Sequence, residues 1–118
     1  MSKRTRLEES LISTGFPFRP GDNFRAYMRM FAEITQRTAG VRRPGAAALD
    51  LAYVAAGRLD GYFERGLKPW DHAAGALLVQ EAGGRVSRID RESPRPFLIA
   101  GGVTLHDRLR DILDEEKP

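Results

Sequence analysis

Hydrophobic and polar positions follow one another along this chain in patterns that predict helices separated by short strands. Apolar residues recur at helical spacing in the segments 24–39, 46–56, 71–82 and 104–113. Short apolar or β-branched runs lie between or before them, at 11–14, 41–43, 59–64, 85–90 and 97–100. Strands that alternate with helices pair in parallel through crossover connections. We therefore expect a layered α/β domain with a mostly parallel sheet of about five strands and flanking helices.

The helix predicted from Asp71 to Ala82 has both ends marked. Asp71 is a preferred N-cap residue, and the pair Gly83 and Gly84 allows the left-handed conformation that closes a helix. One stripe of this helix is apolar and comprises Trp70, Ala73, Ala74, Leu77 and Leu78. The small residues Ala73, Ala74 and Gly75 would let a neighbouring backbone or a ligand approach closely. A carboxylate at the positive end of a helix stays ionised, so Asp71 is a candidate ligand for a divalent cation.

The other helices are predicted from the same periodicity. The first presents Phe24, Tyr27, Met28, Phe31 and Ile34 on one face, which is typical of core packing. The helix at 46–56 carries Asp50 as its only charge, so we expect it to be nearly buried. Thr104 is predicted to cap the last helix, whose buried face comprises Leu105, Leu109, Ile112 and Leu113.

Composition narrows the class of protein. The chain has 118 residues, enough for one domain, with 42% hydrophobic residues, 30% charged residues and no cysteine. No run approaches the roughly 18 apolar residues of a membrane span, so we expect no membrane partner and a cytoplasmic location. Residues 1–45 hold nine Lys or Arg against four Asp or Glu. These charges are scattered and no nucleic-acid motif accompanies them, so a solvated surface is favoured over nucleic-acid binding.

Two stretches of the chain follow a known pattern. The run Trp70-Asp71-x-Ala-Ala-Gly-x-Leu-Leu-Val-x-Glu-Ala-Gly-Gly resembles the C-terminal signature of the inositol monophosphatase family of magnesium-dependent sugar phosphatases. The segment from Arg42 to Glu64 resembles the one that precedes this signature in bacterial members, and Ser13-Thr14-Gly15-Phe16-Pro17-Phe18 also fits. The resemblance implies the fold of the C-terminal half of the sugar phosphatase.

The resemblance also implies roles for five residues. Asp71 would be a catalytic residue that ligates Mg²⁺ and contacts a substrate hydroxyl, whereas by itself it is most often just an N-cap. Glu64 would accept a hydrogen bond from a sugar or inositol hydroxyl, although charged residues commonly end strands. Gly45, Ala46 and Ala47 would form a wall against the substrate ring, although a turn and a helix start explain them equally. Family members commonly have Ser or Thr where this chain has Ala46, so a hydroxyl contact is lost there.

The sequence does not indicate a role for either histidine. His72 and His106 lack the partner spacing of a zinc site or of a Ser-His-Asp set.

The resemblance covers only part of the family's catalytic machinery. The family's other metal ligands, a glutamate and an Asp-Pro-hydrophobic-Asp-Gly-Thr motif, lie in its N-terminal half and are not found in this chain. We therefore expect residues 1–118 to be a single domain equivalent to the C-terminal half, with a basic start at 1–9 and a frayed tail at 114–118. The intact enzyme would hydrolyse the phosphate monoester of inositol monophosphate or a related sugar phosphate with Mg²⁺, and this fragment would be inactive alone.

The expected partners follow from this interpretation. They are a small-molecule polyol phosphate and either a second copy, as a dimer or other homo-oligomer, or the missing N-terminal half. The alternatives are a non-catalytic module that binds a polyol phosphate or nucleic acid, and an assembly module.

Overall fold

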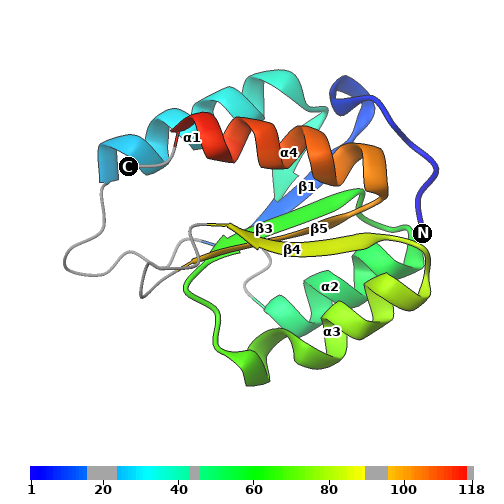
Figure 1. Ribbon diagram of the computed structural model, residues 1–118. Coiled ribbons are helices and arrows are strands. Elements are labelled where there is room, and N and C mark those ends of the chain that lie inside the picture. The colour runs from blue at the N-terminus through cyan, green and yellow to red at the C-terminus, as the bar shows by residue number, and fades with distance from the viewer. Residues whose placement is uncertain (16–23, 43–45, 90–95, 117–118) are drawn as a thin grey trace.

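The structure is a computed structural model that describes residues 1–15, 24–42, 46–89 and 96–116. After a short 3₁₀ turn at Leu7–Glu9, helices and strands alternate along most of the chain (Figure 1). The strands are β1 (Leu11–Thr14), β2 (Gly40–Arg42), β3 (Gly61–Arg65), β4 (Arg85–Ile89) and β5 (Phe97–Gly101). The helices are α1 (Phe24–Arg37), α2 (Ala47–Ala56), α3 (Pro69–Glu81) and α4 (Val103–Glu116).

The five strands form one mixed sheet in the order β2-β1-β3-β5-β4. β1 pairs in parallel with β2 and with β3, whereas β5 runs antiparallel to both β3 and β4. The expected layered α/β domain with five strands is confirmed, and β5 is the strand that runs against the other four. Ile89 of β4 pairs directly with Phe97 of β5, so the connection between them is too short for a parallel crossover.

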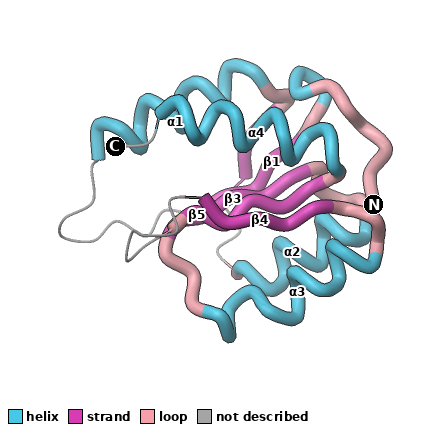
Figure 2. The backbone as a smooth tube through the Cα atoms, in the orientation of Figure 1, coloured by secondary structure: helices cyan, strands magenta, loops and turns pink. Residues whose placement is uncertain are grey.

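The sheet separates two hydrophobic cores. Figures 1 and 2 show α1 and α4 on one face, called here the upper face, and α2 and α3 on the other, the lower face. Side chains of β5 alternate between the cores: Phe97 and Ile99 enter the upper one, Leu98 and Ala100 the lower one. The predicted strand at 97–100 is therefore buried on both faces, as its continuous apolar run indicated.

The faces of α1 and α2 differ from those the periodicity predicted. Among the α1 side chains that the structure describes, Ile34 of the predicted face is buried and Tyr27 packs against the upper core, whereas Met28 is exposed and Met30 is buried instead. In α2 the prediction of a nearly buried helix is wrong, since Leu49 is 46% exposed. Its only charged residue, Asp50, is instead 1% exposed. Only one side of α2 meets the sheet, and that side carries the charge.

The ends of α3 and α4 also differ from the predicted ends. Lys68 is the N-cap of α3 and Asp71 lies in its first turn, so the predicted N-cap at Asp71 is wrong. Gly83, with φ of 94°, adopts the left-handed conformation predicted at the other end. α4 begins at Val103, so Thr104 lies inside the helix and does not cap it. The predicted inner face of α4 is confirmed, because all four of its apolar residues belong to the upper core.

The apolar stripe predicted on α3 faces outward. Trp70, Leu77 and Leu78 are 80%, 57% and 51% exposed, and Ala73 and Ala74 are exposed as well. The buried side of the helix consists of Gly75 and Val79. Within the described residues, none of the helices has the length and apolar character needed to cross a bilayer.

Gly75 lets α3 lie closely against α2. A Cβ atom at Gly75 would lie 2.6 Å from Cβ of Leu51 and 2.7 Å from its Cδ1. The substitution Gly75→Ala gains about 1 kcal/mol of helix propensity. We expect the forced separation of the helices to outweigh this gain and to lower the free energy of unfolding by about 1 kcal/mol. Chemical denaturation measures the change.

The control for this prediction is Ala74→Gly, at the exposed neighbouring position. At this exposed position only helix propensity changes, so we expect Ala74→Gly to lower the free energy of unfolding by about 1 kcal/mol. Alanine is thus preferred at position 74 and glycine at position 75. A Gly75→Ala variant more stable than the original chain would contradict the close packing.

The exposed stripe on α3 leads to a second prediction. Exposed contiguous apolar surface marks a surface that is covered in an assembly. We expect the chain to self-associate and to enhance the fluorescence of a hydrophobic dye. The double substitution Leu77→Gln with Leu78→Lys should reduce both effects and change the free energy of unfolding by less than about 0.5 kcal/mol, since both side chains lie on the surface.

Light scattering after size exclusion and dye titration measure these effects. Val79→Ala, on the buried side of the same helix, is the control and should lower stability without reducing association. A monodisperse monomer that leaves the dye unaffected would contradict the prediction.

Candidate functional site

Polar side chains gather on the lower face of the sheet, at the carboxyl ends of β1 and β3. Helices α2 and α3 both begin at this end (Figure 1). Ser13 of β1 and Tyr62 of β3 are register partners, and Glu64 lies two residues beyond Tyr62 on the same face. The residues of this group, called here the acidic cluster, are Ser13, Asp50, Tyr62, Glu64 and Asp71. Ligands of open α/β sheets bind at this end of parallel strands.

Two features set the position of the Glu64 carboxylate: a hydrogen bond from Tyr62 and the lack of a side chain at Gly15. The Tyr62 hydroxyl donates a hydrogen bond to Oε1 of Glu64. The Glu64 carboxylate lies over Gly15, where a Cβ atom at position 15 would come within 2.4 Å of Oε1. Any side chain larger than hydrogen at position 15 would therefore displace Glu64. The second oxygen of Glu64 is available to accept a hydrogen bond from a ligand hydroxyl.

Negative charge surrounds the Tyr62 hydroxyl. Burial raises the pKa of the Tyr62 phenol. Its hydrogen bond to Glu64 and the charges of Glu64, Asp50 and Asp71 raise that pKa further. The phenol therefore stays protonated and remains a donor. The three acids that act on Tyr62 come from α2, β3 and the first turn of α3.

Asp50 contributes a buried carboxyl group to the cluster from the first turn of α2. Burial raises the pKa of Asp50, the nearby charge of Glu64 adds to the effect, and the neighbouring Ser13 hydroxyl opposes it in part. Neither Oδ1 of Asp50 nor Oγ of Ser13 has a hydrogen-bond partner among the described residues. Asp50 and Ser13 are thus the two fully buried polar side chains of the cluster that lack a partner for these atoms.

Asp71 lies in the first turn of α3 and is half-buried. The backbone N–H of Lys68 donates to Oδ2 of Asp71 at 2.9 Å, and the N–H of Asp71 donates to the carbonyl of Lys68 at 2.8 Å. Asp71 closes the start of the helix from inside its first turn instead of from the N-cap position. This bond occupies Oδ2 and fixes the carboxylate at the helix entrance.

The predicted alanine wall is described in part. Ala46 is the exposed N-cap of α2, and its carbonyl accepts the N–H of Asp50 at 2.9 Å. Ala47 is half-buried and packs against the lower core. Gly45 lies outside the described residues. Ala46 and Ala47 thus begin the helix that brings Asp50 into the cluster.

The acidic cluster supplies only part of what a Mg²⁺ ion requires. Among the described residues, no group of three or more His, Asp or Glu side chains could hold a metal ion. Asp71 by itself would provide one carboxylate ligand. The described residues therefore do not fit a complete magnesium site.

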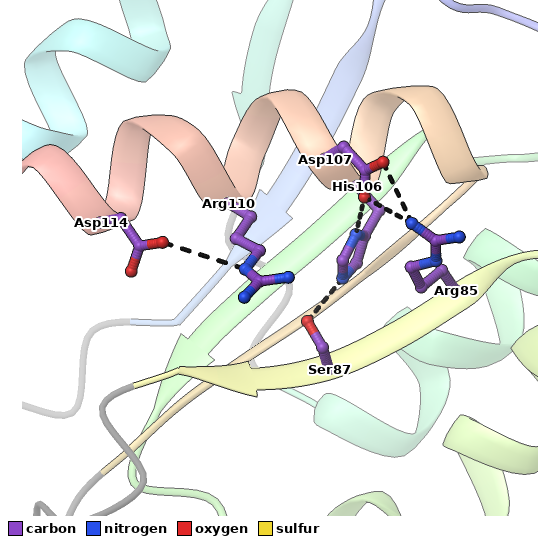
Figure 3. A network of polar contacts seen from close by, with 6 residues as sticks. All are labelled: Arg85, Ser87, His106, Asp107, Arg110 and Asp114. Carbon is purple, nitrogen blue, oxygen red and sulfur yellow. Dashed lines mark hydrogen bonds and ion pairs between the residues drawn. The ribbon is translucent and has the colours of Figure 1, made fainter.

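A second polar network connects β4 to α4 on the upper face (Figure 3). Ser87 Oγ lies 2.6 Å from Nε2 of His106, and Nδ1 of His106 lies 2.8 Å from Oδ1 of Asp107. Arg85 donates to both oxygens of Asp107, at 2.9 and 3.0 Å. Asp107 only accepts hydrogen bonds, so Nδ1 of a neutral His106 carries the proton and Nε2 accepts the Ser87 hydroxyl.

This network corrects the prediction that His106 has no Ser and Asp partners. His106 is fully buried, and burial lowers the pKa of its imidazole. The hydrogen bond from His106 and the charge of Arg85 hold the pKa of the Asp107 carboxyl below its usual range. The network therefore attaches α4 to the edge strand β4. His72 differs, because both of its ring nitrogens are buried without a partner among the described residues.

The sequence predicts site roles for Glu64 and Asp71 but assigns none to Asp50, Tyr62 or Ser13, although Ser13 belongs to a stretch that resembles the family. One signal was visible for Asp50, because it is the single charge in the apolar run 46–56. A lone charge in such a run either breaks the buried face or serves a site.

The fold and the cluster together define an α/β protein whose polar site lies where its parallel strands end. A sequence model of the inositol monophosphatase family matches residues 1–115. The Nus factor SuhB of Pseudomonas aeruginosa is 61% identical over 105 residues, which cover 87% of this chain and 38% of that protein. The inositol-1-monophosphatase of Caulobacter vibrioides is 46% identical over 117 residues, 96% of this chain and 46% of that protein. The chain therefore belongs to the inositol monophosphatase family.

A solved structure agrees with this assignment. The extragenic suppressor protein SuhB of Bartonella henselae is 41% identical and superposes with a TM-score of 0.85. The match covers 97% of this chain and 45% of that one. The chain thus spans less than half the length of the relatives named here.

The buried Asp50 leads to a prediction about pH. Its pKa is raised in the folded state, so the folded chain keeps this proton to a higher pH than the unfolded chain does. The stability that Asp50 contributes is full below its unfolded pKa and is lost as pH rises through its folded pKa. Asp50→Asn cannot titrate. We therefore expect its free energy of unfolding, relative to the original chain, to increase as the pH rises from the unfolded pKa of aspartate through the raised folded pKa of Asp50.

The control is Asp60→Asn, which changes an equally buried acid that has partners. Asp60 accepts the N–H of Leu11 at 2.7 Å and pairs with Arg4 at 3.5 Å. We expect Asp60→Asn to lower the free energy of unfolding by about 1 kcal/mol, because hydrogen bonds to charged groups are stronger than those between neutral groups. Denaturant titrations at several pH values measure both variants. An Asp50→Asn curve parallel to that of the original chain would contradict the prediction.

Proposed function

We propose that this chain is the substrate-reading half of a magnesium-dependent phosphatase that hydrolyses inositol monophosphate or a related sugar phosphate. The observation that supports it most is the position of the Glu64 carboxylate, which accepts a hydrogen bond from Tyr62 and lies over Gly15. Two carboxylates at the end of the sheet supply acceptors for the O–H donors of a polyol. Ala46 and Ala47, with Gly45, would line the other side of the substrate ring.

Magnesium would supply the Lewis acid and the activated water in the intact enzyme. Asp71 is the residue of this chain that we assign to it, with its Oδ1 not engaged by the Lys68 N–H. The chain's own contribution is to orient the polyol through Glu64 and Asp71. A cytoplasmic location and a dimeric state are part of the proposal by resemblance.

An assembly module is the second candidate function, and the exposed stripe on α3 favours it. Nucleic-acid binding receives less support from the chain. Of the basic residues at its start, Arg4 pairs with Asp60 and Arg6 with Glu8 at 2.6 Å. Several relatives carry the name Nus factor SuhB, so the expectation of no nucleic-acid partner stays a prediction.

The purified chain is expected to release no phosphate from inositol 1-phosphate in the presence of Mg²⁺. One metal-binding carboxylate does not hold the pair of ions that such hydrolysis uses. A colorimetric phosphate assay measures the rate, with Asp71→Asn and the distant Glu33→Gln as matched variants. Hydrolysis that Asp71→Asn removes and Glu33→Gln retains would contradict the expected inactivity of the chain.

A binding experiment tests the proposal directly. Titration of the labelled chain with inositol 1-phosphate, followed by NMR, should shift the resonances of Gly15, Glu64 and Asp71. Glu64→Gln should weaken the binding roughly fivefold or more, as expected for loss of one charge-assisted hydrogen bond. Shifts confined to other parts of the chain would overturn the assignment of the polyol site.

A further inference from the structure

The acidic cluster contains a buried carboxyl group to which neither the resemblance nor the comparisons assign a role. Asp50 is 1% exposed and its Oδ1 has no hydrogen-bond partner among the described residues. Ser13, the register partner of Tyr62 on the neighbouring strand β1, is fully buried, and its Oγ has no hydrogen-bond partner among the described residues either. Buried polar groups without partners are rare, and each calls for a physical explanation.

The surroundings of Asp50 are specific. The charge of Glu64 on β3 raises the pKa of Asp50, and the charges of both acids raise the pKa of the Tyr62 phenol. On β1, Ser13 is its uncharged neighbour, and at the start of α3 Asp71 adds a third negative charge near Tyr62. In the part of the chain that the structure describes, no donor reaches Oδ1 of Asp50, so this oxygen stays unpaired.

Asp60 shows what a structural buried acid of this chain looks like. It is 2% exposed, accepts a backbone N–H and pairs with an arginine. Asp50 makes neither kind of bond through Oδ1. A buried carboxyl group whose Oδ1 lacks such partners, and on which the charge of Glu64 acts, is better explained by its effect on that acid.

We propose that Asp50 is a positioning residue of the polyol site: with Ser13 it forms the floor that keeps the Glu64 carboxylate over Gly15. The proposal rests on the proposed function, since Glu64 is the acid that accepts the substrate hydroxyl. A protonated Asp50 has an O–H that can donate within the cluster, to Ser13 or to Glu64. An ionised Asp50 has no donor and repels Glu64 from its seat.

Coupling between the two acids is the first test, and it needs no ligand. The ¹³C resonance of the Asp50 carboxyl group is followed against pH in the original chain, in Glu64→Gln and in Glu33→Gln. We expect the midpoint of Asp50 above the ordinary range of aspartate. It should fall in Glu64→Gln, because the negative charge that raises it is removed, and stay unchanged in Glu33→Gln, whose acid pairs with Arg37 on α1. If the titration midpoint of Asp50 is the same in Glu64→Gln as in the original chain, the proposal is overturned.

Replacement of Asp50 is the second test, with inositol 1-phosphate as the probe and NMR shifts as the readout. The amide introduced by Asp50→Asn keeps N–H donors at every pH, so this variant should bind within about twofold of the original chain and lose the pH dependence of binding. Asp50→Leu has similar size and no donor, and should bind roughly fivefold more weakly. Dispersed spectra establish that both variants are folded.

The outcomes separate this inference from the proposed function. If the original chain does not bind the probe while the Asp50 midpoint falls in Glu64→Gln, the polyol site fails and the positioning of Glu64 by Asp50 stands. If Asp50→Leu binds as the original chain does, with the same pH profile, Asp50 is a structural residue and the inference fails.

Discussion

The alternation of side chains along the central strands β3 and β5 is the constraint on which the rest of the molecule depends. Phe63 enters the upper core and Tyr62 the lower one, and β5 repeats this alternation from Phe97 to Ala100. Each face then needs a cover of helices, which α1 with α4 and α2 with α3 provide (Figure 1). A shift of one residue in the pairing of β3 would exchange the two faces. It would move Tyr62 and Glu64 to the face opposite α2, so the residues of the acidic cluster would no longer lie together.

The lower core is apolar at its centre and polar at the end where β1 and β3 finish. Leu51, Val54, Leu98 and Val79 fill its centre, and Asp50, Tyr62 and Ser13 take over where β1 and β3 end. Polar groups without partners cost free energy when they are buried. Evolved proteins retain such arrangements mainly where a function requires them. Among the described residues, Ser13 and Asp50 place two such groups at the end of the sheet where a ligand would bind.

The helical layer of α2 and α3 is apolar on both sides for a related reason. Its inner side covers the sheet through Leu51, Val54 and Val79. Its outer side exposes Trp70, Leu77 and Leu78, which a solvated surface does not require. The upper layer differs, since the inner face of α4 is apolar and its outer positions carry charged residues such as Arg108 and Asp111. The relatives named above are more than twice as long as the matched region, and the lower layer is the side of this chain that is suited to a further layer of structure.

The sequence by itself determined the number and kind of the elements, because hydrophobic period and Gly or Pro positions act locally. It also predicted site roles for Glu64 and Asp71, which the structure places near the end of β3 and in the first turn of α3, the next helix along the chain. Periodicity shows that one side of a helix is apolar, but another element decides which side is covered. For this reason only the tertiary structure showed that Asp50 is buried while Leu49, one residue earlier, is exposed. The direction of β5, the seat of Glu64 over Gly15 and the bond between Ser87 and His106 likewise depend on residues that are far apart in the chain and meet only in the folded molecule.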